Sequence, residues 1–348
     1  MKKKICILAE LDSIISERLE SEFDIVFRKT KENQKIGTTE ESLAELLEKY
    51  DPEIAVIEAN PFTRGVIGKA KSLKLIASVR TTPSNIDMVA AREAGVVVTN
   101  APGRNAIAVA EFAIALILSC ARNIPKAHHA LKIGKYLLPD TISPDNNVND
   151  VIWTNKNLER RPYLDFRGHE IMGSTLGIFG LGYIGRLVAQ RALALGMKVI
   201  AFDPFVSKED MLAIDCRKVG FDELLLGSDY ISLHAKTSEE TKGKFDINAF
   251  GTMKNTAYLI NTARGALVNQ GDLVEALKNG LIAGAALDVF ESEPLQVGNE
   301  LLTLDNIIHT PHIGGATADV VRHQSDLVMR NIDAYCKGES LPDAWGKK

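Results

Sequence analysis

Short apolar runs alternate with segments of helical periodicity along the first hundred residues. The runs "KICILA", "DIVF", "IAVIEA", "LKLIASV" and "VVVTN" predict strands, and "LAELLEKY" and "MVAAREAG" predict helices between them. Alternation of this kind is typical of parallel sheets with crossover helices. We therefore expect a small α/β domain over about residues 1–100.

The same alternation resumes at Ser174 and continues toward the C-terminus. The strands predicted there are "TLGIFG", "KVIAFD", "DYISLHA", "AYLINTA", "IAGAALDVF" and "NIIHTPHI". Residues 316–337 follow as an amphipathic helical pattern that could return to the first domain. A length of 348 residues with 45% hydrophobic content agrees with two domains of this class.

Two segments between these regions break the alternation. The stretch that begins "NAIAVAEFAIALILSCA" is apolar on nearly all sides for about four turns, so we expect a helix buried against something large, such as a second subunit. Residues 136–169 are rich in Asn, Asp and Pro and predict a long loop, in which Trp153, Tyr163 and Phe166 favour an ordered, packed conformation.

The charge and the cysteine spacing bear on the binding partners and the cellular location that we expect. The net charge is −4, and no block of like charges extends beyond "KKK" at residues 2–4, so we expect neither nucleic acid nor an anionic membrane as partner. The cysteines, at positions 6, 120, 216 and 336, are far apart and lack CxxC spacing, which predicts small buried hydrophobes rather than disulfides or metal ligands. With no signal peptide or membrane span expected, the predicted location is the cytoplasm.

The glycines of "TLGIFGLGYIG" form the strongest local motif. Gly180, Gly182 and Gly185 follow an apolar strand, open a helix and precede a second strand that ends at Asp203. In this context GxGxxG predicts a dinucleotide site, with the pyrophosphate at the helix N-terminus. A carboxylate at Asp203 would bind ribose hydroxyls and repel a 2′-phosphate, which favours NAD over NADP. The alternative is a glycine-rich turn without a ligand.

Three later segments offer groups for acid and base chemistry. Arg264 follows the apolar strand of "LINTARGALV", where its guanidinium could bind a carboxylate through two hydrogen bonds. The segment "GAALDVFESEP" carries three carboxylates, and "NIIHTPHIGGAT" carries His309 and His312. From these residues alone, a surface arginine, solvated carboxylates and structural histidines remain open alternatives.

Together, "GIFGLGYIG", "INTARGALV", "ALDVFESEP" and "TPHIGGAT" occur in the order and at the spacings of one family. Over nearly its whole length the chain resembles the D-isomer-specific 2-hydroxyacid dehydrogenases, and its "PGRNA" resembles a phosphoglycerate-dehydrogenase-like subgroup. The resemblance implies an α/β fold of two Rossmann-like domains. A flavodoxin-like substrate domain would comprise residues 1–104 and 317–348, and a doubly wound NAD-binding domain residues 105–316.

The resemblance also implies residue roles. His312 would donate a proton to the substrate carbonyl oxygen, Glu293 would fix the tautomer of that histidine, and Arg264 would hold the substrate carboxylate. Asp288 and Glu291 then take structural or peripheral roles in catalysis. The cofactor-binding residues would be Gly180, Gly182, Tyr183, Ile184, Gly185, Asp203, His234, Thr262 and Asp288. In the segment that carries His234, Lys236 occupies a position where this family more usually has a proline.

The substrate loop departs from the common glycine-rich form. It reads "SVRTTPSNID", so Arg80 adds a permanent charge, and Thr81 and Arg104 are further candidates for substrate binding. We expect a phosphorylated or polyhydroxylated D-2-hydroxy acid, such as 3-phosphoglycerate; alternatively, Arg80 only pairs with a carboxylate across the cleft.

Two other functions and a dimeric state are also considered for this chain. The rival functions are a glyoxylate or hydroxypyruvate reductase and an NAD-sensing, corepressor-like scaffold. A homodimer is expected from the apolar helix and the resemblance. No serine-sensing regulatory domain and no metal are expected.

Overall fold

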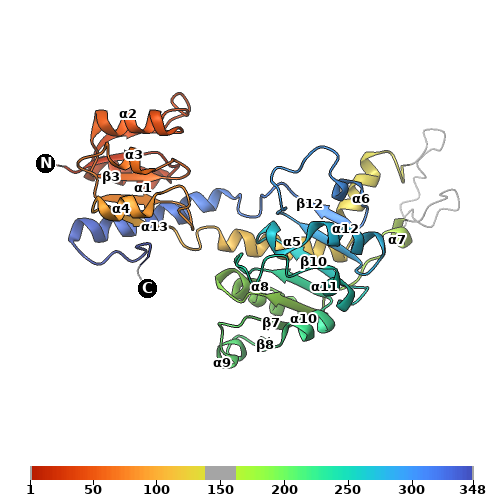
Figure 1. The fold of residues 1–348 in the computed structure, drawn as a ribbon. Coiled ribbons are helices and arrows are strands. Elements are labelled where there is room, and N and C mark those ends of the chain that lie inside the picture. The colour runs from red at the N-terminus through yellow and green to blue at the C-terminus, as the bar shows by residue number, and fades with distance from the viewer. Residues whose placement is uncertain (1, 138–161, 347–348) are drawn as a thin grey trace, which may run out of the picture. The chain divides into compact units, whose positions relative to one another are not determined.

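The computed structural model describes residues 2–137 and 162–346, so most of the predicted long loop, including Trp153, lies outside the described residues. The chain divides into two compact units. Unit 1 comprises Met1–Asn105 with Gly315–Lys348, and unit 2 comprises Ala106–Gly314. Each unit has a parallel sheet with helices on both faces, which confirms the predicted α/β class (Figure 1).

Unit 1 contains a five-stranded parallel sheet in the order β2-β1-β3-β4-β5. This is the flavodoxin-like strand order. Its strands are β1 (Lys4–Ile7), β2 (Asp24–Arg28), β3 (Ile54–Ile57), β4 (Leu75–Ser78) and β5 (Val97–Thr99). Its helices are α1 (Ser13–Glu22), α2 (Glu40–Tyr50), α3 (Arg64–Ile67), α4 (Met88–Glu93) and α13 (Ala318–Lys337).

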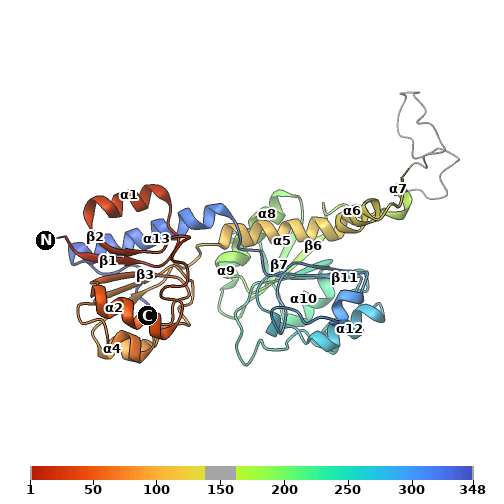
Figure 2. The same ribbon diagram turned by 90° about the horizontal axis from the view of Figure 1, so that it is seen from above.

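Both faces of this sheet are apolar because both are covered by helices. In β1, Ile5 and Ile7 pack in the core that includes α1 and α13, whereas Cys6 and the following Leu8 pack in the core that includes α2, α3 and α4. Figure 2 shows α1 and α13 on one side of the sheet and α2 and α4 on the other. The predicted return of the C-terminal helix to the first domain is thus confirmed.

Unit 2 contains a seven-stranded parallel sheet in the order β12-β11-β10-β9-β6-β7-β8. The order reverses at β6, as in doubly wound dinucleotide-binding folds. The strands are β6 (Thr175–Phe179), β7 (Lys198–Phe202), β8 (Arg217–Lys218), β9 (Tyr230–Leu233), β10 (Tyr258–Asn261), β11 (Gly284–Leu287) and β12 (Ile307–His309). The sequence did not predict β8, because two residues are too short for an alternating pattern.

Helices on the two faces of this sheet bury separate cores. One face is covered by α5 (Ala106–Ala121) and α8 (Tyr183–Ala194), and the other by α10 (Phe221–Gly227), α11 (Ile247–Thr252) and α12 (Gln270–Lys278). The remaining helices are α6 (Ile124–Lys132), α7 (Pro162–Asp165), α9 (Lys208–Leu212), and the 3-10 turns Gly265–Leu267 and Glu300–Thr303.

The strongly apolar helix α5 finds most of its partners inside unit 2. It packs on α8 and on strands β10 and β11, and most of its side chains are buried there. Its apolar composition alone therefore does not require a second subunit. No single helix among residues 2–137 and 162–346 is long and apolar enough to span a bilayer; α5 and α6 reach that length only as a pair bent by 68°.

Cysteine burial differs from the expectation at one position. Cys6, Cys120 and Cys216 are buried, but Cys336 is exposed near the end of α13. Amphipathic α13 buries only one face, so a cysteine on its outer face meets solvent. Burial raises the pKa of the Cys6 and Cys120 thiols to about 12, which makes these two unreactive. The cytoplasmic location remains a prediction.

The two described ends of the predicted loop contact each other. The Tyr136 hydroxyl donates to Asp165 at 2.8 Å, and the Tyr136 and Phe166 rings meet edge to face. Tyr163 instead is 76% exposed, which differs from the packed position expected for it.

Candidate active site

The glycine turn after β6 has the geometry that its sequence predicted. Gly180 has φ +92°, and an added Cβ would lie 2.6 Å from the Ala235 nitrogen. A Cβ on Gly185 would lie 2.3 Å from the Gly180 oxygen, so glycine is required here for close packing of helix and strand. Gly182 instead faces open space, with no described atom within 4 Å of an added Cβ.

This open space lies at the N-terminus of α8. The helix begins at Tyr183 after Gly182, without a side-chain cap, and Ile184 packs partly into the core of unit 2. Uncapped N–H groups and the helix dipole make such a terminus a favourable place for a phosphate. The residues present therefore fit a dinucleotide pyrophosphate.

Asp203 stands at the end of β7 and is bound to the glycine turn. Its Oδ2 accepts from the Leu181 N–H and its Oδ1 from the Phe205 N–H, both at 2.8 Å. The carboxylate thus orders the turn, and each oxygen keeps acceptor capacity for a ribose hydroxyl.

Arg264 is positioned by a buried asparagine at the end of β10. The Asn261 side chain, 1% exposed, donates to the Arg264 carbonyl oxygen at 2.9 Å and accepts from the Ala263 N–H at 3.0 Å. The Arg264 side chain itself is exposed and bonds only the Ala263 carbonyl oxygen among the described residues. Its guanidinium therefore retains donors for an anion. The asparagine was missed in the sequence, although an Asn at a strand end before a turn is a recognisable signal.

Glu293 and His312 form a direct hydrogen-bonded pair. Glu293 Oε2 lies 2.6 Å from His312 Nδ1, and the other carboxylate oxygen accepts from the Phe290 N–H at 3.0 Å. Gly265 packs so closely on Phe290 that an added Cβ would lie 1.9 Å from its carbonyl, which brings the Arg264 turn against the Glu293 loop. The carboxylate accepts from Nδ1–H, so Nε2 remains for proton transfer.

A buried carboxylate holds the loop that carries the histidine. Asp288, 1% exposed, accepts from the Thr310 hydroxyl at 2.6 Å and from the backbone N–H groups of Ile313 and Gly314 at 2.8 and 2.7 Å. These bonds fix His312 at φ +57°, which a non-glycine residue rarely adopts. Asp288 therefore orders the loop of His312, a role that the sequence did not specify.

Glu291, the neighbouring carboxylate, has a peripheral contact. It accepts from the Gln270 N–H at the start of α12 at 3.0 Å.

The three predicted substrate residues belong to unit 1 and differ in the hydrogen bonds that their side chains form. The Arg80 guanidinium forms no hydrogen bond or ion pair within the described part of the chain, and the Thr81 hydroxyl donates to the Ala101 carbonyl at 3.3 Å. Arg104 donates to Glu58 at 3.4 Å and to the buried Gln324. Within unit 1 it is therefore Arg104 that pairs with a carboxylate, and the pairing of Arg80 across the cleft stays an untested alternative.

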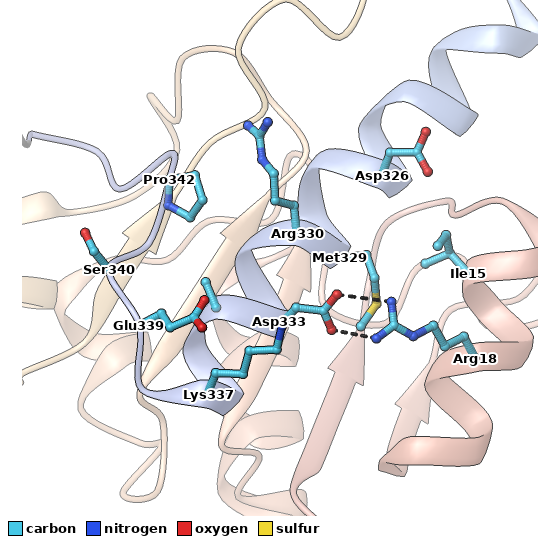
Figure 3. Close-up of a pocket in the computed structure, with 11 residues that line it drawn as sticks. Ile15, Arg18, Asp326, Met329, Arg330, Asp333, Lys337, Glu339, Ser340 and Pro342 are labelled. Carbon is cyan, nitrogen blue, oxygen red and sulfur yellow. Dashed lines mark hydrogen bonds and ion pairs between the residues drawn. The ribbon is translucent and has the colours of Figure 1, made fainter.

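A separate groove of unit 1 is lined by none of the predicted cofactor, catalytic or substrate residues. It has a volume of about 410 Å³ and lies beside α1, α13 and the segment that follows α13 (Figure 3). Arg18 donates to both oxygens of Asp333, at 2.7 and 3.1 Å, and Arg330 donates to Asp343 at 2.5 Å. Its arginines are neutralised by carboxylates, so this groove is not the candidate active site.

The fold and the glycine turn of unit 2 define a dinucleotide-binding protein of the doubly wound α/β class. Residues 114–314 match the family "D-isomer specific 2-hydroxyacid dehydrogenase, NAD binding domain". The chain belongs to this family, and unit 2 contains its NAD-binding domain.

Three relatives illustrate the similarity. The chain is 39% identical to a D-3-phosphoglycerate dehydrogenase of Archaeoglobus fulgidus over 89% of its own length and 54% of the relative's. It is 38% identical to a hydroxypyruvate reductase of Thermotoga maritima over 85% of its length and 89% of the relative's. The apo structure of D-mandelate dehydrogenase from Rhodotorula graminis superposes with a TM-score of 0.81 at 26% identity, covering 100% of this chain and 98% of that one. The chain spans about half the length of the phosphoglycerate dehydrogenases it matches.

Proposed function

We propose that the protein is an NAD-dependent oxidoreductase that interconverts a D-2-hydroxy acid and its 2-keto acid. The observation that carries this proposal is the 2.6 Å contact between Glu293 and His312 in the unit that contains the dinucleotide turn. A carboxylate-oriented imidazole is a suitable general acid for a carbonyl oxygen. A scaffold that only senses NAD would bind NADH without turnover, and the test below distinguishes it from an enzyme.

NAD is the proposed cofactor, and the residues of the glycine turn would hold it. The α8 N-terminus would bind the pyrophosphate and Asp203 the adenosine ribose. Tyr183 and Ile184, the first two residues of α8, would lie beside the pyrophosphate. When bound, the nicotinamide supplies or accepts the hydride at the substrate carbon.

The chain's own groups would do the rest of the chemistry. Arg264 would bind the substrate carboxylate and align the carbonyl. In reduction, His312 Nε2 gives a proton to the carbonyl oxygen, and in oxidation it takes the proton back. Glu293 stabilises the resulting imidazolium through its bond to Nδ1.

The test of the proposed function is NADH oxidation at pH 7 against a panel of 2-keto acids. The panel includes glyoxylate, hydroxypyruvate and phosphorylated hydroxypyruvate, so it also separates the rival reductase functions. We expect saturable turnover with at least one of these acids. Bound NADH with no turnover across an extended panel of keto and sugar acids would contradict the proposal.

The proposed substrate carries a second anionic or polyhydroxylated end, such as the phosphate of 3-phosphoglycerate. This is supported by the guanidinium of Arg80, which follows β4 and has no hydrogen-bond or ion-pair partner within the described residues. Arg104 could assist only by leaving Glu58 and Gln324.

Replacing Arg80 by alanine should raise KM for the phosphorylated acid by about 10- to 100-fold, because a charge-assisted bond is lost. The KM for the corresponding acid without the phosphate should change by about twofold at most. Arg80→Lys is the matched control, since it keeps the charge and should recover part of the loss. Unchanged KM values for both acids in Arg80→Ala would show that this side chain takes no part in substrate selection.

The proposed assembly is a homodimer. Its support is a set of exposed apolar side chains on α6 and the segments around it: Ile124, Leu131, Ile133, Leu137, Tyr163, Leu164 and Met172. Exposed apolar side chains in such number are typical of interaction surfaces.

Sedimentation at micromolar concentration should give a particle of twice the chain mass of 38.0 kDa. Leu131→Glu should shift it toward the monomer, because a charge would be buried in the interface. Leu212→Glu on α9 is the control, since Leu212 is similarly exposed, at 53% against 51%. A native particle of 38.0 kDa would exclude the dimer.

A further inference from the structure

Two buried polar atoms of unit 2 have no hydrogen-bond partner within the described residues. They are Nδ1 of His234 and Oγ1 of Thr262. Leu233 pairs with Asn261 across strands β9 and β10, and His234 and Thr262 are the residues that directly follow this pair. Buried polar atoms are nearly always hydrogen-bonded, so two at adjacent strand ends indicate a missing partner.

These atoms lie just beyond the carboxyl ends of β9 and β10, at the same end of the sheet as the glycine turn that follows β6. The His234 N–H donates to the Phe179 carbonyl at 2.8 Å, and an added Cβ on Gly180 would lie 2.9 Å from the His234 carbonyl carbon. In the strand order, β9 and β10 follow β6 on one side, and β7 with Asp203 follows on the other. Since Asp203 would take the adenosine end of a dinucleotide, the nicotinamide end falls on the side of β9 and β10.

The tautomer of His234 follows from a single buried hydroxyl. Ser232 Oγ lies 2.8 Å from His234 Nε2, and Ser232 is fully buried. This hydroxyl has no other hydrogen-bond partner in the described part of the chain, so its hydrogen is satisfied only by donation to Nε2. An Nε2 that accepts leaves the ring proton on Nδ1.

The ring is also kept neutral. Burial lowers the pKa of His234 to about 3, so it carries no charge at physiological pH. A neutral donor suits a site beside a nicotinamide, which is cationic when oxidised.

We infer that Ser232 is a positioning residue that holds His234 as the Nδ1–H tautomer. With the Thr262 hydroxyl, Nδ1–H then binds an uncharged hydroxyl or carbonyl oxygen of the nicotinamide half of the dinucleotide. This inference rests on the proposed function, because it takes NAD as the ligand.

The first test distinguishes the two ring nitrogens by substitution. The amide nitrogen of asparagine reaches the position of Nδ1, whereas that of glutamine reaches the position of Nε2. We expect the Kd for NADH, measured by fluorescence titration, to change by about threefold at most in His234→Asn and to rise about tenfold in His234→Gln. Equal losses, or the reverse order, would overturn the assignment of Nδ1 as the donor.

The second test needs no nucleotide. The ¹⁵N spectrum of the histidine side chains in the ligand-free protein should show His234 as the Nδ1–H tautomer, and Ser232→Ala should introduce the Nε2–H form. Ser232→Thr retains the hydroxyl and should restore the native tautomer. Thermal unfolding of all variants identifies any that fail to fold.

These tests distinguish a failure of the inference about His234 from a failure of the proposed function. An Nε2–H tautomer in the native protein overturns the inference alone. A native protein that binds no NADH overturns the proposed function and the ligand with it.

Discussion

Replacing His312 by alanine should lower kcat for keto-acid reduction by about 10²- to 10⁴-fold. The reason is that the imidazole would supply the proton as the carbonyl is reduced, and no other titratable side chain is bonded to Glu293 within the described residues. The Kd for NADH should change by about twofold at most, because the histidine is proposed to act on the substrate rather than on the dinucleotide. Steady-state kinetics and fluorescence titration measure the two quantities separately.

The neighbouring His309 offers a matched control. Its Nε2 is 3.0 Å from the Leu301 carbonyl oxygen, and glutamine can reproduce that bond. His309→Gln should therefore keep kcat close to the native value. Native turnover in His312→Ala would show that this histidine is not the acid.

Replacing Gly265 by alanine should lower the free energy of unfolding by about 3 kcal/mol or more, which is the upper range for overpacking. The added Cβ would lie 1.9 Å from the carbonyl carbon and oxygen of Phe290, and backbone atoms cannot yield as a flexible side chain can. Because Gly265 follows Arg264 and Phe290 precedes Glu293, any protein that folds should also lose turnover. Urea denaturation with a two-state fit measures the stability change.

Gly271 provides the comparison for this substitution. It lies in the first turn of α12, and the nearest described side-chain atom to an added Cβ would be Asn269 Oδ1, at 3.5 Å. Gly271→Ala should leave stability within about 1 kcal/mol of native, or raise it slightly, since alanine is the better helix former. Similar unfolding curves for both variants would argue against close packing at Gly265.

Much of the candidate site could be predicted because its residues occupy strand ends. Arg264, Glu293 and His312 each follow an apolar strand, and the carboxyl ends of parallel strands meet at one edge of a sheet. The pairing of Glu293 with His312 was expected only from a family resemblance, since no local pattern specifies which carboxylate meets the ring.

The supporting residues were harder to predict. Asp288 was expected both in a structural or peripheral role and among the cofactor-binding residues, and the three described hydrogen bonds of its carboxylate go to the loop of His312. Its partners lie more than 20 residues away in sequence, beyond the reach of periodicity or spacing. Asn261 and Ser232 looked like ordinary polar positions in strands until their burial was known.

The two α/β units, the parallel sheets, the glycine turn and the strand ends that carry the reactive groups could all be predicted from the amino-acid sequence. These features depend on the alternation of apolar positions and on the backbone freedom of glycine, both of which are local. Only the folded structure shows that Arg104 is bound by Glu58 and Gln324, whereas the Arg80 guanidinium has no partner within the described residues. It also decided that Asp288 orders the histidine loop, because hydrogen-bond partners are chosen by proximity after folding, not by position along the chain.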